Sequence, residues 1–326
     1  MIHPRILIVG KDGLLTWHDS LRVAFAELGF ESQVFSASPR RLGERASRLC
    51  GAGRSLDNRL IRGRFRRAIA RFQPDLILSL IGAFPREILE DAGCRNGRRP
   101  LLAVWMCDSL MHEFNPQQHE KLDFFFTFDR SQMAKAAPFV RSDGFFSLPL
   151  AFDPREYHPL PKAHSEAVAV FAGSCTEERL ELAINLRARG IPLATAGMGW
   201  QKRGLKIRQP RLTHAQLNRH FNAGSVAINH VQHLNTAYGI NLRAFEATGA
   251  GACLITPVVF DLASCFEPGL EVVSYRSTDE LAELVKRGLS DPAWSRKIAA
   301  AGHRRALAEH TFVHRARTIA THCGWI

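Results

Sequence analysis

The sequence predicts an α/β protein with two tandem, doubly wound domains built on parallel sheets. Short apolar runs alternate with helical stretches, several of these runs end in glycine, and a proline-marked segment interrupts the alternation near residue 160. Strands that alternate with helices form parallel sheets covered by helices on both faces. At 326 residues the chain is long enough for two domains of ordinary size. We therefore expect two Rossmann-like domains that face each other across a cleft.

The first half of the chain begins with a strand, a glycine turn and a helix. Arg5 to Val9 is a short apolar run, the turn Gly10-Lys11-Asp12-Gly13 follows it, and Leu21, Phe25 and Leu28 then repeat at helical spacing. The elements expected after these are a strand at 30–36, a basic amphipathic helix at 59–72, and strands at 75–81, 101–107 and 124–128.

A linker separates the two halves, with prolines at 149, 154, 159 and 161. We place the N-terminal domain at 1–160 and the C-terminal domain at 161–326, and we expect the last helix to pack back on the N-terminal domain. Beyond the linker the expected strands are 168–172, 193–196, 225–229, 252–256 and 272–275, and the expected helices are 177–189, 241–249, 278–289 and 292–310.

The net charge of +12 is unevenly distributed along the chain. Residues 40–71 hold eleven arginines against two acidic residues, which leaves a local charge of +9. Such a face suits nucleic acid, an anionic membrane surface or an acidic acceptor, and it is equally compatible with a solvated arginine-rich helix. Because no signature of RNA or DNA recognition accompanies the charge, no nucleic-acid partner is expected. Peripheral contact with an anionic membrane remains a candidate role.

The composition gives little support for a membrane-spanning, secreted, disulfide-linked or metal-binding protein. No apolar run approaches the roughly 20 residues of a membrane span, and the N-terminus has no secretory signal, so a cytoplasmic protein is expected. The seven cysteines are dispersed and form no C-x-x-C motif. His310 with His314, and His230 with His233, are spaced as pairs on a helix face, but each pair lacks further ligands. We expect no metal site.

The most informative segment is 239–256, which predicts a loop, a short helix, a glycine break and a buried strand. Arg243 and Glu246 lie three residues apart and therefore share one face of the helix. A guanidinium can bind phosphate oxygens, and a carboxylate can accept hydrogen bonds from ribose hydroxyls. The pair therefore suits a nucleotide diphosphate, although a simple surface ion pair has the same spacing.

This segment resembles the donor-binding signature of GT-B glycosyltransferases, and specifically of the CgeB-like (spore-maturation-protein-like) glycosyltransferase family. The resemblance continues through 266–275, 279–281, 289–292, 301–304 and 309–315, and it covers about residues 165–320. In the first half it is limited to the layout of the elements and to the strand end Val104-Trp105-Met106-Cys107-Asp108. The likeness implies an acceptor domain at 1–160 and a nucleotide-sugar-binding domain at 161–326.

Carried over residue by residue, the resemblance implies that Glu246 holds the ribose of the donor. Arg243 is then expected near the phosphates or as a group that orients Glu246, beside Asn241. Gly249 is expected to keep the backbone close to the ligand. In many retaining GT-B enzymes a first glutamate stands eight positions before the second, where this chain has Tyr238. Retention or inversion at the anomeric carbon is therefore left open.

A second group follows the first strand of the C-terminal half. Gly173 and Ser174, with Arg179 shortly after them, resemble the turn in which backbone N–H groups and a nearby cation receive a diphosphate. The alternative is an ordinary turn from a strand to a helix. No cofactor is implied apart from the nucleotide-diphospho-sugar, which is the donor substrate.

Catalytic candidates come from the first half of the chain. An inverting transfer needs a general base within hydrogen-bond reach of the acceptor hydroxyl. Asp12, His18 and Asp108 are titratable groups close to predicted strand ends. Each could instead cap a helix or lie in a polar loop.

The sequence thus predicts a metal-independent glycosyltransferase that moves a sugar from a nucleotide-diphospho-sugar to an acceptor. The acceptor could be a polysaccharide, a lipid-linked molecule or a protein, in keeping with cell-surface glycan biosynthesis. Two alternatives remain, namely a nucleotide-sugar epimerase of the same fold and a non-catalytic protein that binds anions or nucleic acid.

Overall fold

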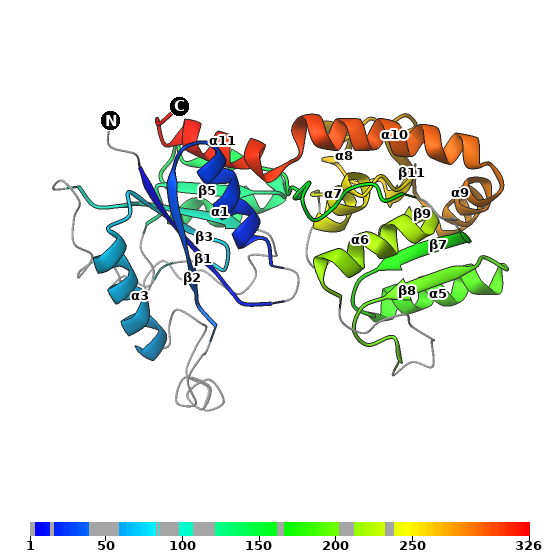
Figure 1. Ribbon diagram of the computed structural model, residues 1–326, viewed down its shortest axis with the longest axis horizontal. Coiled ribbons are helices and arrows are strands. Elements are labelled where there is room, and N and C mark those ends of the chain that lie inside the picture. Colours follow the sequence, from blue (N-terminus) through cyan, green and yellow to red (C-terminus); the bar gives the residue numbers. More distant parts are fainter. Residues whose placement is uncertain are drawn as a thin grey trace. The chain divides into compact units, whose positions relative to one another are not determined.

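The chain divides into two compact units (Figure 1). Unit 1 comprises Met1–Leu148 and Arg315–Ile326, and unit 2 comprises Pro149–His314. The computed structural model describes residues 4–13, 16–38, 59–82, 84, 98–106, 121–161, 166–201, 212–231 and 238–326.

Unit 1 contains a six-stranded parallel sheet with the strand order β2-β1-β3-β4-β5-β6. The strands are β1 (Arg5–Gly10), β2 (Glu31–Ser36), β3 (Leu76–Ser79), β4 (Leu101–Met106), β5 (Phe124–Thr127) and β6 (Phe145–Ser147). Ile6 to Val9 are at most 1% exposed, because helices cover both faces of a doubly wound sheet. The continuous apolar runs of the sequence therefore form its central strands.

Among the described residues of unit 1, the longer helices are α1 (His18–Glu27), α3 (Arg59–Phe72) and the end of α11 (Phe312–His322). Three short helical segments lie between β5 and β6, namely η3 (Arg130–Gln132), α4 (Met133–Ala136) and η4 (Ala137–Phe139). His322 of α11 stacks on Phe146 with ring centroids 3.5 Å apart, and Trp325 packs against Phe30. The last residues of the chain therefore belong to the hydrophobic packing of unit 1.

Unit 2 contains a five-stranded parallel sheet with the order β11-β10-β9-β7-β8. Its strands are β7 (Glu166–Ala172), β8 (Leu193–Ala196), β9 (Gly224–Ile228), β10 (Leu254–Pro257) and β11 (Val273–Tyr275). The helices in the described part of this unit are α5 (Glu177–Ala188), α6 (His214–Ala223), α7 (Leu242–Gly249), α8 (Leu262–Cys265), α9 (Thr278–Ser290) and α10 (Pro292–Glu309). Both units therefore have the parallel α/β architecture that the sequence predicts.

The strand order of unit 2 places a topological switch point between β7 and β9. The chain leaves β7 toward β8 on one side of it, and then crosses back to place β9 on the other side. The connections after β7 and after β9 consequently diverge and leave room at the carboxyl ends of these two strands. In open α/β sheets this is where ligands bind.

The boundary between the units lies at Leu148 and Pro149 rather than near residue 160. The predicted linker packs on unit 2: the Phe152 amide donates to the carbonyl of His310 at 3.0 Å, and the Leu160 amide donates to Asn222 Oδ1 at 2.8 Å. Its prolines indicate an irregular backbone but do not reveal which unit that backbone contacts. This segment therefore contributes side chains to unit 2.

Candidate functional site

The short helix α7 carries the ion pair that its sequence spacing predicts. Arg243 and Glu246 lie one turn apart, and Arg243 Nη1 donates to Glu246 Oε2. The Glu246 side chain is 2% exposed and that of Arg243 is 25% exposed, so the carboxylate is buried while the Arg243 side chain is partly accessible. The pair is therefore a partly buried arrangement and not a surface ion pair.

Tyr157 and His214 extend this pair into a chain of hydrogen bonds, and sequence reasoning missed both residues. The Tyr157 hydroxyl donates to Glu246 Oε1 at 2.8 Å and lies 2.8 Å from His214 Nδ1. Because the phenol has a single proton, His214 must donate from Nδ1. Burial and the Glu246 carboxylate raise the pKa of Tyr157 far above its usual value, so the hydroxyl remains a donor.

Arg179 lies at the switch point and bridges the ends of β7 and β9. Its Nη1 donates to the carbonyl of Ser174 at 3.1 Å, and its Nη2 donates to the carbonyl of His230 at 3.3 Å. A Cβ atom on Gly173 would stand 2.8 Å from Arg179 Nη1, so the guanidinium fits only because residue 173 is glycine. Gly173 and Arg179 are six positions apart in the sequence, and in the structure the absence of a side chain at Gly173 leaves room for the Arg179 guanidinium.

The site has an excess of positive charge. Burial, followed by the charge of the Arg243 guanidinium, lowers the pKa of Arg179. Glu246 pairs with Arg243, whereas no carboxylate in the described part of the chain forms an ion pair with Arg179. Two neighbouring guanidiniums, of which only Arg243 is paired with a carboxylate, favour an anionic ligand, which would relieve their mutual repulsion.

Asn241 adds two features at the start of α7. Its Nδ2 donates to the His230 carbonyl at 3.1 Å, the same oxygen that accepts from Arg179. Its Oδ1 is buried and has no partner among the described residues, and its side chain does not cap the helix. The first N–H groups of α7 therefore lack a side-chain cap, and such groups bind anions well.

Six of the seven predicted donor-site residues lie at or beside the switch point of unit 2. They are Gly173, Ser174, Arg179, Asn241, Arg243 and Glu246. Gly249 is the exception, because it ends α7 and a Cβ atom there would lie 2.2 Å from Phe152 Cδ2. The requirement for glycine at 249 therefore comes from packing against the Phe152 ring.

Of the catalytic candidates in unit 1, His18 is buried and closely packed. It begins α1, is 7% exposed, and its Nδ1 would stand 2.7 Å from a Cβ atom on Gly10, the last residue of β1. Burial lowers its pKa, opposed in part by Asp19 and Asp12. Asp12 is exposed in the loop after β1, where its amide donates to Ser38 Oγ at 2.8 Å. Asp108 lies outside the described residues.

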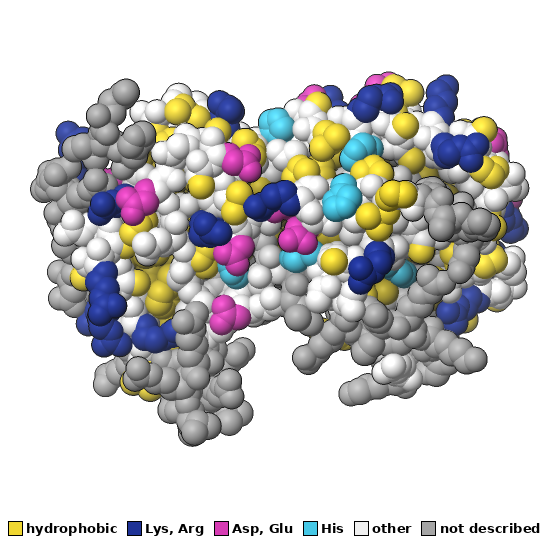
Figure 2. Space-filling model, viewed as in Figure 1, with side chains coloured by type: hydrophobic (Ala, Val, Ile, Leu, Met, Phe, Trp, Pro, Cys, Tyr) yellow, Lys and Arg dark blue, Asp and Glu magenta, His cyan; other side chains and the backbone are white. Residues whose placement is uncertain are grey.

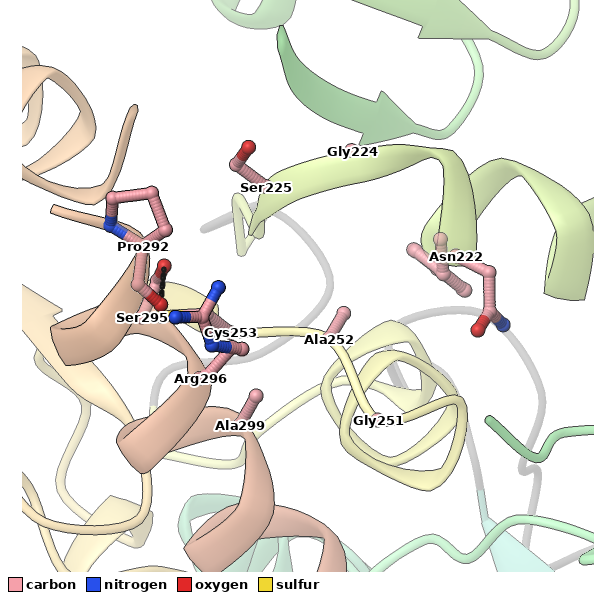
Figure 3. A pocket seen from close by; sticks show the side chains of 11 residues that line it. Asn222, Gly224, Ser225, Gly251, Ala252, Cys253, Pro292, Ser295, Arg296 and Ala299 are labelled. Carbon is pink, nitrogen blue, oxygen red and sulfur yellow. Dashed lines mark hydrogen bonds between the residues drawn. The ribbon is translucent and has the colours of Figure 1, made fainter. Parts of the chain in front are cut away.

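A small pocket of unit 2 lies at the opposite edge of the sheet (Figure 3). Ser225 at the start of β9, Cys253 just before β10, and Ser295 and Arg296 near the start of α10 line it. Its volume of about 30 Å³ suffices for a water molecule but not for a nucleotide. It is therefore separate from the group around Arg179 and Glu246.

The described part of the basic segment 40–71 is helix α3 (Figure 1), and dark blue Lys and Arg side chains gather on this part of the surface in Figure 2. Arg62, Arg64, Arg66, Arg67 and Arg71 lie on it, and the helix contains no acidic residue. Arg64 donates to the carbonyls of Ser36 and Ser38, whereas Arg67 and Arg71 are exposed. The helix thus buries an apolar face and presents cations to solvent. No helix among the described residues is long and apolar enough to cross a membrane.

The second half of the chain resembles a known family of proteins. A family model described as glycosyl transferase-like matches residues 178–321, from α5 to the end of α11. The match includes Arg179, Arg243 and Glu246. Among curated proteins none matches the sequence. The more specific resemblance to the CgeB-like family stays a prediction.

Solved structures match the whole length of the chain. Sucrose-phosphate synthase from Thermosynechococcus elongatus is 15% identical, with a TM-score of 0.68 and 98% of each chain covered. Anabaena HepE in complex with UDP and glucose is 14% identical, with a TM-score of 0.66 over 99% of this chain and 100% of HepE. AviGT4, a glycosyltransferase of avilamycin A biosynthesis, is 17% identical, with a TM-score of 0.64 over 98% of this chain and 96% of AviGT4. The two parallel-sheet units therefore have the fold of GT-B glycosyltransferases.

Proposed function

We propose that the protein is a glycosyltransferase that binds a nucleotide-diphospho-sugar on unit 2 and transfers the sugar to an acceptor. The observation that carries the proposal is the pair of guanidiniums at the switch point, Arg179 and Arg243, of which only Arg243 forms an ion pair with a carboxylate among the described residues. The family match over 178–321 supports the same assignment. HepE, which has the same fold, was solved with UDP and with UDP-glucose.

In this proposal the diphosphate accepts hydrogen bonds from Arg179, Arg243 and the first N–H groups of α7. Glu246 accepts from the ribose. Each of its oxygens already receives one hydrogen bond, from Arg243 or from Tyr157, and retains a second lone pair. The arginines stabilise the charge that develops on the leaving diphosphate, so this mechanism assigns no step to a metal ion.

The acceptor side of the proposal rests on unit 1. A neutral imidazole can take the proton of an acceptor hydroxyl as the sugar is transferred, and burial favours the neutral form of His18. The exposed arginines of α3 suit an anionic membrane surface, which would present a lipid-linked acceptor. A polysaccharide or a protein acceptor is compatible with the same donor site. A role in cell-surface glycan biosynthesis is part of this proposal.

Ligand binding tests the donor assignment directly. We expect at least one of UDP-glucose, UDP-galactose, UDP-N-acetylglucosamine and GDP-mannose to raise the melting temperature, since a ligand at 100 times its Kd stabilises the fold by about 2.7 kcal/mol. Glu246→Gln should abolish that shift while it preserves the shape of the side chain. The proposal is wrong if none of the four donors binds the intact chain in calorimetry.

A further inference from the structure

Two aromatic side chains of unit 2 lie exposed near the candidate donor site. Tyr238 and Phe260, here called the aromatic pair, have ring centroids 5.0 Å apart with an interplanar angle of 36°. Phe260 is 71% exposed, Tyr238 is 42% exposed, and the nearby Val258 is 43% exposed. Two exposed aromatic rings in contact with each other are informative, because such clusters mark binding sites more often than single exposed residues do.

The aromatic pair lies at the ligand-binding edge of the sheet. Phe260 follows the carboxyl end of β10, and Tyr238 precedes the start of α7. The Asp261 amide donates to the Tyr238 carbonyl at 2.9 Å, which holds the two loops together. Tyr238 is three residues before Asn241, so their Cα atoms are at most about 11 Å apart.

The order of groups along α7 matches the order of groups in a nucleotide-sugar. Glu246 is the proposed ribose contact, and Arg243, one turn earlier, is a proposed diphosphate contact. Each residue of a helix advances about 1.5 Å along its axis, so the next position in the same direction lies before the start of α7. Tyr238 precedes that start by four residues in the sequence. A donor that places its ribose at Glu246 and its phosphates at Arg243 directs its sugar toward the aromatic pair.

The chemistry of the pair suits a sugar ring. A hexose has a face of C–H groups that packs on an aromatic ring, and hydroxyls around its edge. Residues 255–260 carry no charge, so this loop offers an apolar surface. The Tyr238 hydroxyl has no hydrogen-bond partner in the part of the chain that the structure describes, and it is available for a sugar hydroxyl.

We propose that Tyr238 and Phe260 form the contact surface for the sugar ring of the donor, with the ring stacked on the pair and a hydroxyl bonded to the Tyr238 phenol. This inference rests on the proposed function. It adds the two residues that distinguish a nucleotide-sugar from its nucleoside diphosphate.

The test compares two ligands in calorimetry on the full chain. One is the donor that stabilises the intact protein most among UDP-glucose, UDP-galactose, UDP-N-acetylglucosamine and GDP-mannose, and the other is the corresponding UDP or GDP. Phe260→Ala should weaken donor binding about tenfold, since stacking on an aromatic ring is worth roughly that much. It should leave the affinity for the nucleoside diphosphate unchanged. Tyr238→Phe should give a smaller loss for the donor alone.

A matched control is Leu270→Ala, because Leu270 is 44% exposed and lies before the amino end of β11 in the same unit. This variant should change neither affinity. Equal losses for both ligands in Phe260→Ala would place the nucleobase on the pair and overturn the inference, as would unchanged affinity for the donor. If the intact chain binds the nucleoside diphosphate but none of the four donors, the proposed function fails together with this inference.

Discussion

The Tyr157 hydroxyl donates a 2.8 Å hydrogen bond to Oε1 of Glu246, a residue 89 positions further along the chain. Arg243 occupies the other carboxylate oxygen, so the orientation of Glu246 is set from two sides. Tyr157 is 2% exposed, and its position is fixed by the packing of segment 149–160 on unit 2. The carboxylate of the proposed ribose contact is therefore preorganised before any ligand arrives.

Tyr157→Phe should weaken both the fold and nucleotide binding. The substitution keeps the ring but leaves Glu246 Oε1 without one donor and His214 Nδ1 without its acceptor. A buried polar group that loses its partner costs about 1–3 kcal/mol, so the free energy of unfolding in urea should fall by that amount. The Kd for UDP or GDP should rise as well, because Glu246 is no longer held.

Two comparisons separate positioning from general destabilisation. Tyr275→Phe removes another buried hydroxyl of unit 2, which donates to the Asn229 carbonyl at 3.0 Å, and it should cost stability but not nucleotide affinity. In a Glu246→Gln background the Tyr157→Phe change should have little further effect on affinity, because it acts through the carboxylate. Additive losses would contradict a positioning role.

The sequence predicts the parts of this site whose residues lie close together in the chain, but not the contacts between residues that are far apart in it. The spacing of Arg243 and Glu246 predicts their shared helix face, and Gly173 with Arg179 predicts a turn that leads into a helix. Tyr157 lies in a segment that prolines mark as irregular, and no periodicity reveals that its hydroxyl reaches α7. His214 likewise begins a helix that the sequence analysis did not predict.

The missed elements have physical causes. Helix α6 (His214–Ala223) carries several polar residues, so its apolar stripe is short, although Thr213 and Gln216 form a capping box at its start. Strand β6 (Phe145–Ser147) has three residues and lies at the edge of its sheet. The continuous apolar runs, by contrast, form the central strands of both units, because a strand that is buried on both faces consists mainly of apolar residues.

Arg179→Gln should reduce the affinity for a nucleoside diphosphate by about 10- to 100-fold. Hydrogen bonds to charged groups are worth about 1.5–3 kcal/mol, and each 1.4 kcal/mol is tenfold in affinity. Calorimetry with UDP and GDP measures the change. Arg189→Gln is the control, because its partner Asp279 is largely exposed and the pair stands at the far end of α5. An exposed ion pair contributes little, so that variant should bind like the intact protein.

Gly249→Ala should destabilise the protein, because the new methyl group would stand 2.2 Å from Phe152 Cδ2. Overpacking of this kind costs about 1–3 kcal/mol, seen as a lower melting temperature. Gly63→Ala offers the opposite case: it lies within α3, and a Cβ atom there meets nothing within 4 Å. This variant should gain about 0.5–1 kcal/mol from the better helix propensity of alanine. Similar effects of the two changes would argue against the packing described for Gly249.

Replacement of Arg67 and Arg71 by glutamine should weaken binding to anionic vesicles. Both side chains are exposed on α3, and an arginine near an anionic surface contributes about 1 kcal/mol, so the pair accounts for roughly a 30-fold change. Co-sedimentation with phosphatidylserine vesicles measures this, and phosphatidylcholine vesicles give the baseline. Lys297→Gln with Arg304→Gln removes two exposed cations from α10 instead, and an equal loss in that variant would show that the effect is not specific to α3.

His18 should make both stability and activity depend on pH, with a sign that its burial determines. The folded state lowers the pKa of His18 below its ordinary value of 6.5, so the unfolded chain binds more protons in this range. The free energy of unfolding should therefore fall as the pH drops below 6.5. The fall should end once the pH lies below the pKa that His18 has in the folded state. Each unit of pKa depression corresponds to about 1.4 kcal/mol.

If His18 is also the general base, kcat/KM should follow the pKa of the folded protein rather than that of free histidine. Sugar transfer would then remain fast at pH values where an exposed histidine is already protonated, and it would decline only below them. His18→Gln should flatten the pH dependence of stability and lower kcat by 10²–10⁴-fold, while the Kd of the donor stays unchanged because His18 belongs to unit 1. A variant that loses the pH dependence of stability but keeps its kcat would assign His18 to packing against Gly10, and the base would have to be sought among the other groups of unit 1.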